Sequence, residues 1–235
     1  VWTAEKVEFF WNWYSQSTGR QSDYFGEKFA SAIVKTIKKQ LPPPAEVLDF
    51  GCGTGKLMLA MANAGYKVSG CDTSEESVAK SRQLLERSEN FNECRILTQR
   101  KLPFAPDSFD IIVATETIEH VLPEWVESVF SSWRSLLTRN GSLILTTPNA
   151  ENLEKATVCC PDCGCEFHRM QHVHTFDCSA IERLTHQYGF DTSVSLTTSL
   201  RYIDLPLLVR STRRAYKWYR AKIGNPITEP NLIWI

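Results

Sequence analysis

The sequence predicts an α/β fold built around a doubly wound parallel sheet, and three observations carry this prediction. Strand-like apolar runs alternate with helix-like segments between residues 46 and 147. A glycine-rich turn, Asp49-Phe50-Gly51-Cys52-Gly53-Thr54-Gly55, joins the first of these runs to the first helix. The chain has 235 residues, of which 43% are hydrophobic, and this is ample for one globular domain with appendages.

The elements follow from local patterns. Two helices are expected within residues 5–40, where aromatic and polar residues alternate at helical spacing, and Pro42-Pro43-Pro44 ends the second one. Thr73 is expected to cap a later helix, with Glu76 closing a capping box. Strands are expected at 46–50, 66–71, 93–98, 109–115, 141–147 and 192–198, with helices at 55–64, 74–88, 123–137 and 179–188. Residues 104–109 are expected to form a loop, and Arg139-Asn140-Gly141 a turn.

The sequence pattern divides the chain into three regions. Residues 1–41 are expected to form an N-terminal helical lid, with packing of its aromatic side chains as the alternative role. The main domain is expected at 45–200 and includes a Cys/His-rich insertion at 151–178. Residues 201–235 form a basic, aromatic tail.

The glycine-rich turn indicates a ligand with a carboxylate or phosphate group. Its backbone N–H groups are expected to face that ligand, because glycine allows close approach. The spacing G-x-G-x-G after Asp49 fits neither the dinucleotide fingerprint G-x-G-x-x-G nor a P-loop. Asp72 ends the next strand about 20 residues after the glycines, the offset at which an acid accepts both ribose hydroxyls.

These residues resemble motif I and the second-strand acid of the class I S-adenosylmethionine (SAM)-dependent methyltransferases. Leu102-Pro103-Phe104, followed by Ser108-Phe109-Asp110, looks like the loop and fourth strand of their type 11, ubiquinone O-methyltransferase-like branch. The resemblance spans roughly residues 46–200 and implies a Rossmann-like, seven-stranded sheet, methyltransferase activity and SAM as cofactor. Gln99 lies near the place of an acid that contacts adenine in that branch, and its amide oxygen can accept the same hydrogen bond. The implied SAM-binding residues are Asp49, Gly51, Cys52, Gly53, Gly55, Asp72, Thr73, Gln99, Leu102 and Thr115.

Candidate catalytic residues follow the strand expected at 109–115. Glu116, Glu119 and His120 stand at i, i+3 and i+4, so one helical turn would place them on one face. Methyl transfer needs an aligned acceptor and removal of its proton, and His120 is the candidate base. Two carboxylates and an imidazole can also hold a divalent cation. The E-x-x-E-H pattern is similar to that of ubiquinone-type and small-RNA 2'-O-methyltransferases, where it implies a metal; a metal-free polar wall facing the acceptor is the alternative.

The Cys/His-rich insertion offers a second metal site. Cys160-x-x-Cys163-Gly164 has the shape of a zinc knuckle, and a structural zinc with Cys160, Cys163, His168 and one further ligand is expected. The candidates for that ligand are His172, His174 and Cys178. The resemblance implies that one histidine of this region instead joins Glu116, Glu119 and His120. Reduced cysteines in a substrate lid, or a Cys160–Cys163 disulfide in an oxidised chain, are the alternatives.

Charge and hydropathy limit the partners. The net charge of -1 gives no overall attraction to nucleic acid or membranes, and no apolar run reaches the ~20 residues of a membrane span. With no signal-peptide pattern visible, a cytoplasmic protein is expected. The tail could give a weak contact with anionic lipid or RNA, or simply be a solvated helix face. Its basic and aromatic residues are Arg210, Arg213, Arg214, Tyr216, Lys217, Trp218, Tyr219, Arg220 and Lys222.

Together these observations predict a SAM-dependent methyltransferase that acts on a hydroxyl of a small molecule, such as a sugar, a quinol or a natural product. RNA 2'-O-methylation is the alternative, supported by E-x-x-E-H and the basic tail. A non-catalytic SAM-binding or zinc-bearing interaction module is the third hypothesis. The sequence leaves the acceptor and the oligomeric state open, because acceptor pockets in such folds are built from irregular segments.

Overall fold

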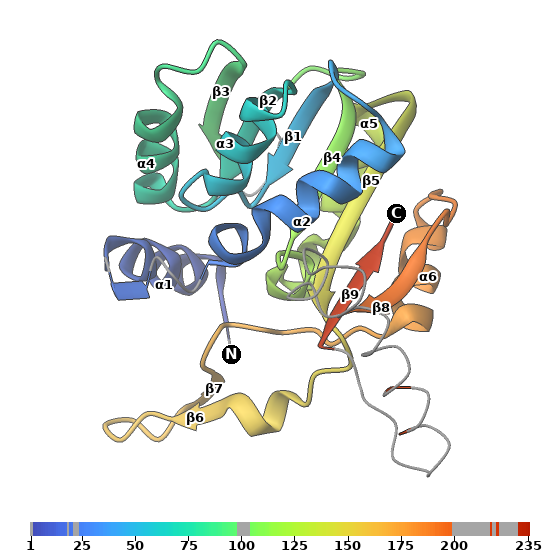
Figure 1. The fold of residues 1–235 in the computed structure, drawn as a ribbon. Coiled ribbons are helices and arrows are strands. Elements are labelled where there is room, and N and C mark those ends of the chain that lie inside the picture. The colour runs from blue at the N-terminus through green and yellow to red at the C-terminus, as the bar shows by residue number, and fades with distance from the viewer. Residues whose placement is uncertain are drawn as a thin grey trace.

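A seven-stranded sheet forms the centre of the molecule (Figure 1). The computed structural model describes residues 2–17, 19–20, 24–97, 104–198, 217, 220 and 230–235. The strand order is β3-β2-β1-β4-β5-β9-β8. The strands are β1 (Glu46–Phe50), β2 (Lys67–Asp72), β3 (Phe91–Ile96), β4 (Phe109–Thr115), β5 (Leu137–Pro148), β8 (Ser195–Thr198) and β9 (Asn231–Trp234). The predicted fold class is confirmed, although β9 runs antiparallel to both β5 and β8.

The seventh strand comes from the segment that the sequence analysis assigned to the tail. Residues 231–234 form β9 between β5 and β8, so this end of the chain belongs to the sheet and not to an appendage. Leu232 and Trp234 are almost fully buried, and the Trp234 indole donates to Thr192 Oγ1 over 2.9 Å. Four residues carry too little pattern to be recognised as a strand without their neighbours. Apart from Lys217, Arg220 and Pro230, residues 201–230 lie outside the described part of the chain.

Helices cover both faces of the sheet, as a doubly wound fold requires. One apolar core joins α2 (Phe25–Gln40), α3 (Lys56–Asn63) and α4 (Glu75–Leu85) to one face, through Ile37, Met58 and Leu85 among others. The other core joins α5 (Val126–Leu136) and α6 (Cys178–Gln187) to the opposite face around Phe130 and Trp133. Along β1 successive side chains alternate between the two cores, with Val47 in the first and Leu48 in the second.

Two local predictions were wrong in detail. The helix α4 is capped by Ser74, whose Oγ accepts from the Ser77 N–H over 3.1 Å, and not by Thr73. Asp72 explains the shift, because its Oδ1 accepts the Ser74 N–H and holds Thr73 in the loop before the helix. The expected turn at Arg139-Asn140-Gly141 lies inside β5, where the register with β4 slips between Phe109 and Ile111. The glycine and asparagine therefore mark an irregularity within a strand.

The N-terminal region forms two helices, as predicted. Helix α1 (Ala4–Gln16) lies against α4, where Ser15 Oγ is 3.1 Å from Ser74 Oγ and Lys80 Nζ donates to the Ser15 carbonyl. Helix α2 packs on α3. In the described part of the chain, no helix combines the length and the hydropathy needed to cross a bilayer.

The insertion after β5 contains one 3₁₀ turn and a short two-stranded hairpin. The 3₁₀ turn Leu153–Ala156 leads into β6 (Thr157–Cys159), which pairs antiparallel with β7 (Glu166–His168). In Figure 1 this hairpin lies below α1, beyond the carboxyl ends of the parallel strands. Those strand ends are where doubly wound folds place their ligands.

Candidate active site

One cavity of about 900 Å³ opens at the carboxyl ends of the parallel strands. Its wall includes the turn after β1, the end of β2, the segment after β4, helix α1 and the end of the insertion. Among its lining residues are Trp11, Tyr24, Asp49, Gly51, Gly53, Asp72, Thr73, Ile96, Leu97, Thr115, Glu116, Glu119, His120, Trp125, Met170 and His172. The cavity therefore joins most of the predicted cofactor residues to the predicted catalytic residues.

The glycine-rich turn reaches the cavity, but not in the way that the sequence suggested. The N–H groups of Gly51 and Cys52 both donate to the Cys71 carbonyl, and the Gly53 N–H donates to Asp72 Oδ2 over 2.9 Å. These amides serve the protein itself, so the expectation that they face a ligand is wrong. What glycine supplies is space: a Cβ on Gly51 (φ +78°) would lie 2.6 Å from Thr117 Oγ1.

Asp49 is a buried acid in the wall of the cavity. Its side chain is 1% exposed, and neither carboxyl oxygen has a hydrogen-bond partner among the described residues. Burial, and then the neighbouring charge of Asp72, raise the pKa of Asp49 to about 8. A cationic group placed in the cavity beside Asp49 would offset this cost. An ammonium group, such as the one at the methionine end of SAM, fits that requirement.

Asp72 is held ready as an acceptor. Gly53 N–H and Ser74 N–H each donate to one of its oxygens over 2.9 Å, and these bonds partly counter the burial that raises its pKa. Each carboxylate oxygen keeps a further lone pair that can accept a hydroxyl. Thr73 and Thr115 also line the cavity. The arrangement fits a vicinal diol such as a ribose.

The remaining predicted cofactor residues are placed differently. Cys52 turns its Sγ toward Cys94 Sγ, 3.5 Å away in the core, so its thiol packs on the protein. Gly55 begins α3 with a left-handed backbone (φ +82°) and packs against Ser81. Gln99 and Leu102 lie outside the described residues. Ile96 and Leu97, which the sequence analysis passed over, line the cavity beside that segment.

The segment after β4 brings the predicted catalytic residues together, without the expected α-helical turn. Glu116 adopts a left-handed backbone (φ +48°), and Ile118–His120 forms a single 3₁₀ turn. The Glu116 N–H donates to the Thr146 carbonyl, and Thr147 Oγ1 donates to Glu119 Oε2 over 3.1 Å. Hydrogen bonds from strand β5 therefore position both Glu116 and Glu119. The spacing of these residues in the sequence could not predict these contacts with β5.

Three ligand atoms in this segment are buried without a hydrogen-bond partner among the described residues: Glu116 Oε1, Glu119 Oε1 and His120 Nδ1. Burial raises the pKa of Glu116 to about 8, and burial followed by the charge of Glu116 raises that of Glu119. Burial and the neighbouring His172 lower the pKa of His120 to about 3, so its imidazole is neutral. Two acids and a neutral imidazole with orphaned atoms are a donor set that suits a divalent cation.

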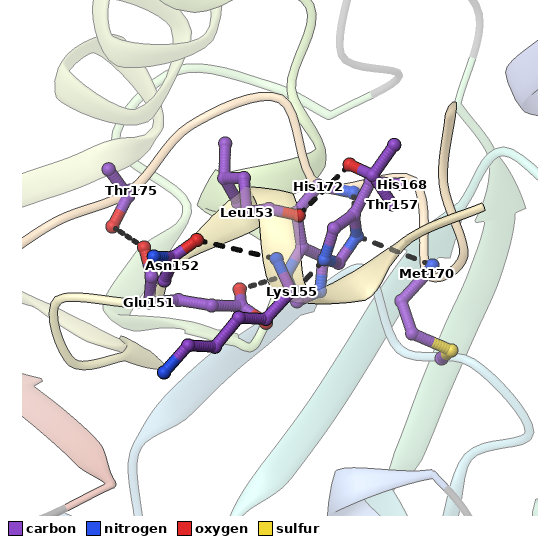
Figure 2. A network of polar contacts seen from close by, with 9 residues as sticks. All are labelled: Glu151, Asn152, Leu153, Lys155, Thr157, His168, Met170, His172 and Thr175. Atoms are coloured by element: carbon purple, nitrogen blue, oxygen red, sulfur yellow. Dashed lines mark hydrogen bonds and ion pairs between the residues drawn. The ribbon is translucent and has the colours of Figure 1, made fainter. Parts of the chain in front are cut away.

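His172 joins this group from the insertion. Its ring lies 4.7 Å from that of His120, and ligand atoms of Glu119, His120 and His172 all lie within 4.8 Å of one another. Figure 2 shows the other side of His172, where Nδ1 bonds to Glu151 and the ring stacks on His168 at 4.5 Å. Glu151, His168 and His172 form a second group of ligand atoms within 4.8 Å. Glu151 thereby orients His172 toward the cavity, as acids do for metal-binding histidines.

The predicted zinc ligands do not form one cluster in the structure. His168 belongs with Glu151 and His172, whereas Cys160 and Cys163 group with Cys165. His174 bonds through Nε2 to the Val121 carbonyl, and Cys178 begins α6. The expected combination of two thiols with His168 is therefore not assembled. The turn at Arg169–His172 separates them, because His168 Nδ1 accepts the N–H groups of Met170 and His172 and so faces inward.

Trp11 and Gln171 complete the site. Trp11 belongs to the N-terminal region that the sequence analysis expected to act as a lid, and it lines the cavity, whereas Gln171 was missed in the sequence. Gln171 is fully buried in a left-handed backbone (φ +63°); its amide donates to the His120 carbonyl and accepts from the Trp11 indole over 3.0 Å. The Trp11 ring meets His120 edge-on at 5.0 Å. Only the cluster of aromatic residues in α1 could have pointed to this contact. A lone glutamine carries no signal.

The sheet order, the glycine-rich turn and the two acids Asp49 and Asp72 define a class I methyltransferase fold with a nucleoside-type site. Residues 21–193 match the methyltransferase domain family, and the chain belongs to it. The class inferred from the sequence is thus confirmed.

Relatives and solved structures agree with this class. Ubiquinone biosynthesis O-methyltransferase of Cereibacter sphaeroides is 30% identical over 128 residues, 54% of this chain and 51% of that protein. The chain thus spans about half the length of the curated relatives it matches. A chain in the complex of the Haloferax volcanii Trm112 methyltransferase activator with a methyltransferase superposes with a TM-score of 0.67 at 15% identity, covering 95% of both chains. A SAM-dependent methyltransferase from Mesorhizobium loti gives 0.59 at 17% identity, covering 86% of this chain and 96% of that one.

Proposed function

We propose that this protein transfers a methyl group from SAM to a hydroxyl of a small aromatic acceptor of the quinol or catechol type. One observation carries the proposal: a single cavity joins Asp49 and Asp72 to Glu116, Glu119 and His120. Donor and acceptor can therefore meet without crossing bulk solvent, as a displacement between two bound molecules requires.

The donor half of the cavity fits SAM. Asp49 would receive the methionine ammonium, and Asp72 would accept the ribose hydroxyls through the lone pairs that Gly53 and Ser74 leave open. Ile96 and Leu97 supply apolar surface for the adenine. When bound, SAM supplies a methyl group attached to a sulfonium. The leaving group is a neutral thioether, so it does not need protonation by an acid. The chain has only to align the acceptor and take up its proton.

The acceptor half favours an aromatic ring. Trp11, Trp125 and Val129 lie in its wall, so a flat apolar body can be enclosed between α1 and the start of α5. Glu119 and His120 supply polar atoms at one end of this half. A phenolic hydroxyl on such a ring would be drawn to these atoms, while an extended polymer would have to pass α1.

Glu119, His120 and His172 are the residues that would hold a divalent cation, and Glu116, whose charge raises the pKa of Glu119, is a further candidate ligand. Their orphaned oxygens and imidazole nitrogen support this assignment, and Glu151 orients His172 from behind. A cation held there would lower the pKa of an acceptor hydroxyl and position it. In the absence of a cation, His120 Nδ1 has a free lone pair and is the candidate base. The two roles of His120 exclude each other, so metal dependence separates them.

The curated relatives support the reaction type. They are named as O-methyltransferases of ubiquinone biosynthesis, and one of them is 30% identical to this chain over 128 residues. We extend this to a hydroxylated aromatic ring as acceptor. RNA is the alternative acceptor, and the experiments below test it.

The decisive experiment pairs binding with turnover. Calorimetry should detect binding of S-adenosylhomocysteine, and labelled SAM should pass its methyl group to catechols or quinols of graded size. The metal arm adds Mg²⁺, Mn²⁺ or a chelator to the same assay. Transfer that survives complete chelation would remove the cation and leave His120 as the base.

A panel of short single-stranded and duplex RNAs tests the acceptor. Methylation of RNA 2'-hydroxyls with no transfer to phenols would replace the proposed acceptor class. Binding of S-adenosylhomocysteine without any transfer to either panel would favour a SAM-binding module that does no chemistry.

A further inference from the structure

The hairpin β6–β7 is poorly supported by ordinary packing. Each strand has three residues, and all three residues of β6 are exposed. Val158 is 40% exposed although it is the central residue of its strand. A two-stranded hairpin of this size is at best marginally stable in water. Packing supports only β7, where Phe167 meets the Trp2 ring edge-on at 6.0 Å and His168 is buried, and it leaves β6 and the tip without an apolar core.

Three thiols meet at the tip of this hairpin. The sulfur atoms of Cys160, Cys163 and Cys165 lie within 4.8 Å of one another, with 3.3 Å between those of Cys163 and Cys165. The backbone forms a tight knuckle, since the Gly164 N–H donates to the Cys160 carbonyl and the Cys160 N–H donates to the Cys165 carbonyl, each over 2.8 Å. Gly164 has a left-handed backbone (φ +69°) with open space around it. The turn thus gathers its sulfur atoms on one side.

We propose that Cys160, Cys163 and Cys165 bind a zinc ion at the tip of the hairpin, with a water molecule in the fourth position. The ligand set differs from the one expected from the sequence, because Cys165 takes the place assigned to His168. Thiolates bind zinc tightly, C-x-x-C is the usual spacing of a first pair of ligands, and a water molecule can complete a set of three protein ligands. The site is separate from the cavity and from the cation assigned to Glu119 and His120.

Local electrostatics favour a thiolate at Cys163 and not at Cys165, whose pKa the neighbouring Cys163 thiol raises. The backbone N–H of Cys165, and then the thiols of Cys165 and Cys160, lower the pKa of the Cys163 thiol. An N–H group directed at sulfur favours the charged form, which is the form that binds a metal.

A disulfide is the competing chemistry, and it fits the cluster less well. A disulfide joins two sulfur atoms and leaves the third as an exposed thiol, whereas zinc uses all three. Cys159, next in the chain, keeps its thiol near the Cys160 carbonyl and outside the cluster. Cys159 is therefore a matched control: an exposed cysteine on the same hairpin that is not a ligand.

Zinc at the tip would also stabilise the acceptor side of the cavity. Strand β7 ends at His168, whose ring stacks on His172 at 4.5 Å (Figure 2). The Arg169 N–H donates to the Ala156 carbonyl across the base of the hairpin, over 2.9 Å. A metal that fixes the tip would also fix the pairing of β6 with β7. The turn 169–172, which follows β7 and carries His172, would then be held in position. This part of the inference rests on the proposed role of His172.

The test is zinc content of the full chain, produced without a histidine tag, in the Glu119→Gln background so that the cavity site does not contribute. We expect one zinc per chain in that background and in Cys159→Ser. Cys163→Ser and Cys165→Ser should lose it. Replacing zinc with Co²⁺ should give thiolate charge-transfer absorption that the same two variants lack. Retained binding of S-adenosylhomocysteine shows that each variant is folded.

Three results would overturn the proposal. Zinc-free protein with reduced thiols after purification in zinc-containing medium would remove the metal. A mass lower by two hydrogens, restored by a reductant, would replace it with a disulfide. Loss of zinc from Cys159→Ser would overturn the three-thiolate assignment. Binding of S-adenosylhomocysteine and methyl transfer by the wild-type chain are measured independently of zinc content, so failure of this proposal and failure of the proposed function can be told apart.

Discussion

The donor side and the acceptor side of the cavity are built in different ways. Asp49, the glycine-rich turn and Asp72 lie within one continuous stretch of chain, and the bonds that fix them are local to β1, β2 and α3. The acceptor side joins Trp11 of α1, the segment after β4 and the insertion, which are far apart in the sequence. The difference implies that the acceptor pocket can change while cofactor binding is retained.

The two sides nevertheless share one physical feature. Each buries carboxyl groups that have orphaned oxygens, Asp49 on one side and Glu116 and Glu119 on the other. Burial raises the pKa of these acids, which disfavours their charged forms until a cation arrives. Perturbed acids in a cavity are typical of functional sites. The cation differs: an ammonium group suits the single acid, and a metal ion suits the pair.

The largest effect should come from the acceptor side. Glu119→Gln keeps the size of the side chain and its contact with Thr147, and removes the charge. We expect methyl transfer to fall by roughly 10²- to 10⁴-fold, as for loss of a group that assists proton removal. Binding of S-adenosylhomocysteine, measured by calorimetry, should stay at the wild-type level.

The exposed Glu124, in the neighbouring 3₁₀ turn, provides the control. Glu124→Gln should leave both transfer and binding unchanged. Equal losses of transfer and cofactor affinity in Glu119→Gln would show that the two sides are not independent.

The matching change on the donor side is Asp49→Asn. Loss of a charged hydrogen-bond partner for the ligand should weaken S-adenosylhomocysteine binding by roughly 10- to 100-fold. The ligand-free variant should at the same time be more stable than wild type. Wild-type Asp49 has a pKa of about 8 when folded against its usual 3.8, so folding retains a proton that the unfolded chain releases.

The sign of this pH effect follows directly. The stability that wild-type protein owes to this group falls as pH rises from about 4 to about 8, and Asp49→Asn lacks that loss. The difference in melting temperature between variant and wild type should therefore grow over this range. A constant difference from pH 5 to pH 8 would mean that Asp49 is already ionised in the ligand-free protein.

Gly51 and Thr117 test one point at which the two sides touch. A Cβ on Gly51 would lie 2.6 Å from Thr117 Oγ1 and 2.7 Å from its Cγ2. Gly51→Ala should therefore destabilise the fold by roughly 1–3 kcal/mol in urea unfolding, through this clash and the left-handed backbone. Adding Thr117→Ala removes both close atoms and should recover part of the loss, with a coupling of roughly 0.5–3 kcal/mol. Additive effects would place the whole cost in the backbone.

The smallest effect should come from Gln171, which ties α1 to the acceptor side. Gln171→Ala removes the bonds to the His120 carbonyl and the Trp11 indole, each worth roughly 0.5–1.5 kcal/mol. We expect a roughly 2- to 10-fold lower kcat, with unchanged affinity for S-adenosylhomocysteine. Gln171→Gly is the companion variant, because it loses the same bonds but relieves the left-handed backbone. If Gly restores the rate that Ala loses, the backbone and not the side chain matters.

The order of these effects would also show which side limits the reaction. If Asp49→Asn reduced transfer at saturating SAM as strongly as Glu119→Gln does, the donor side would take part in the chemistry and the comparison would fail.

The amino-acid sequence by itself determined the fold class, and it singled out Asp49 and Asp72, which line the cavity. Strand and helix periods are local, and a glycine turn with acids at fixed offsets keeps its meaning wherever the chain places it. Asp49, Asp72 and the doubly wound sheet could therefore be predicted, while the cap at Ser74 differed by one residue because a bond from Asp72 competed for the same turn.

Only the tertiary structure decided the rest. It placed residues 231–234 inside the sheet, exchanged His168 for Cys165 among the grouped thiols, and brought Trp11, Gln171 and Glu151 to the site. It also showed that the amides of Gly51, Cys52 and Gly53 are already bonded within the protein. The physical reason is common to all of these: each depends on which distant segment satisfies a buried polar or apolar group, and a single sequence does not record that pairing.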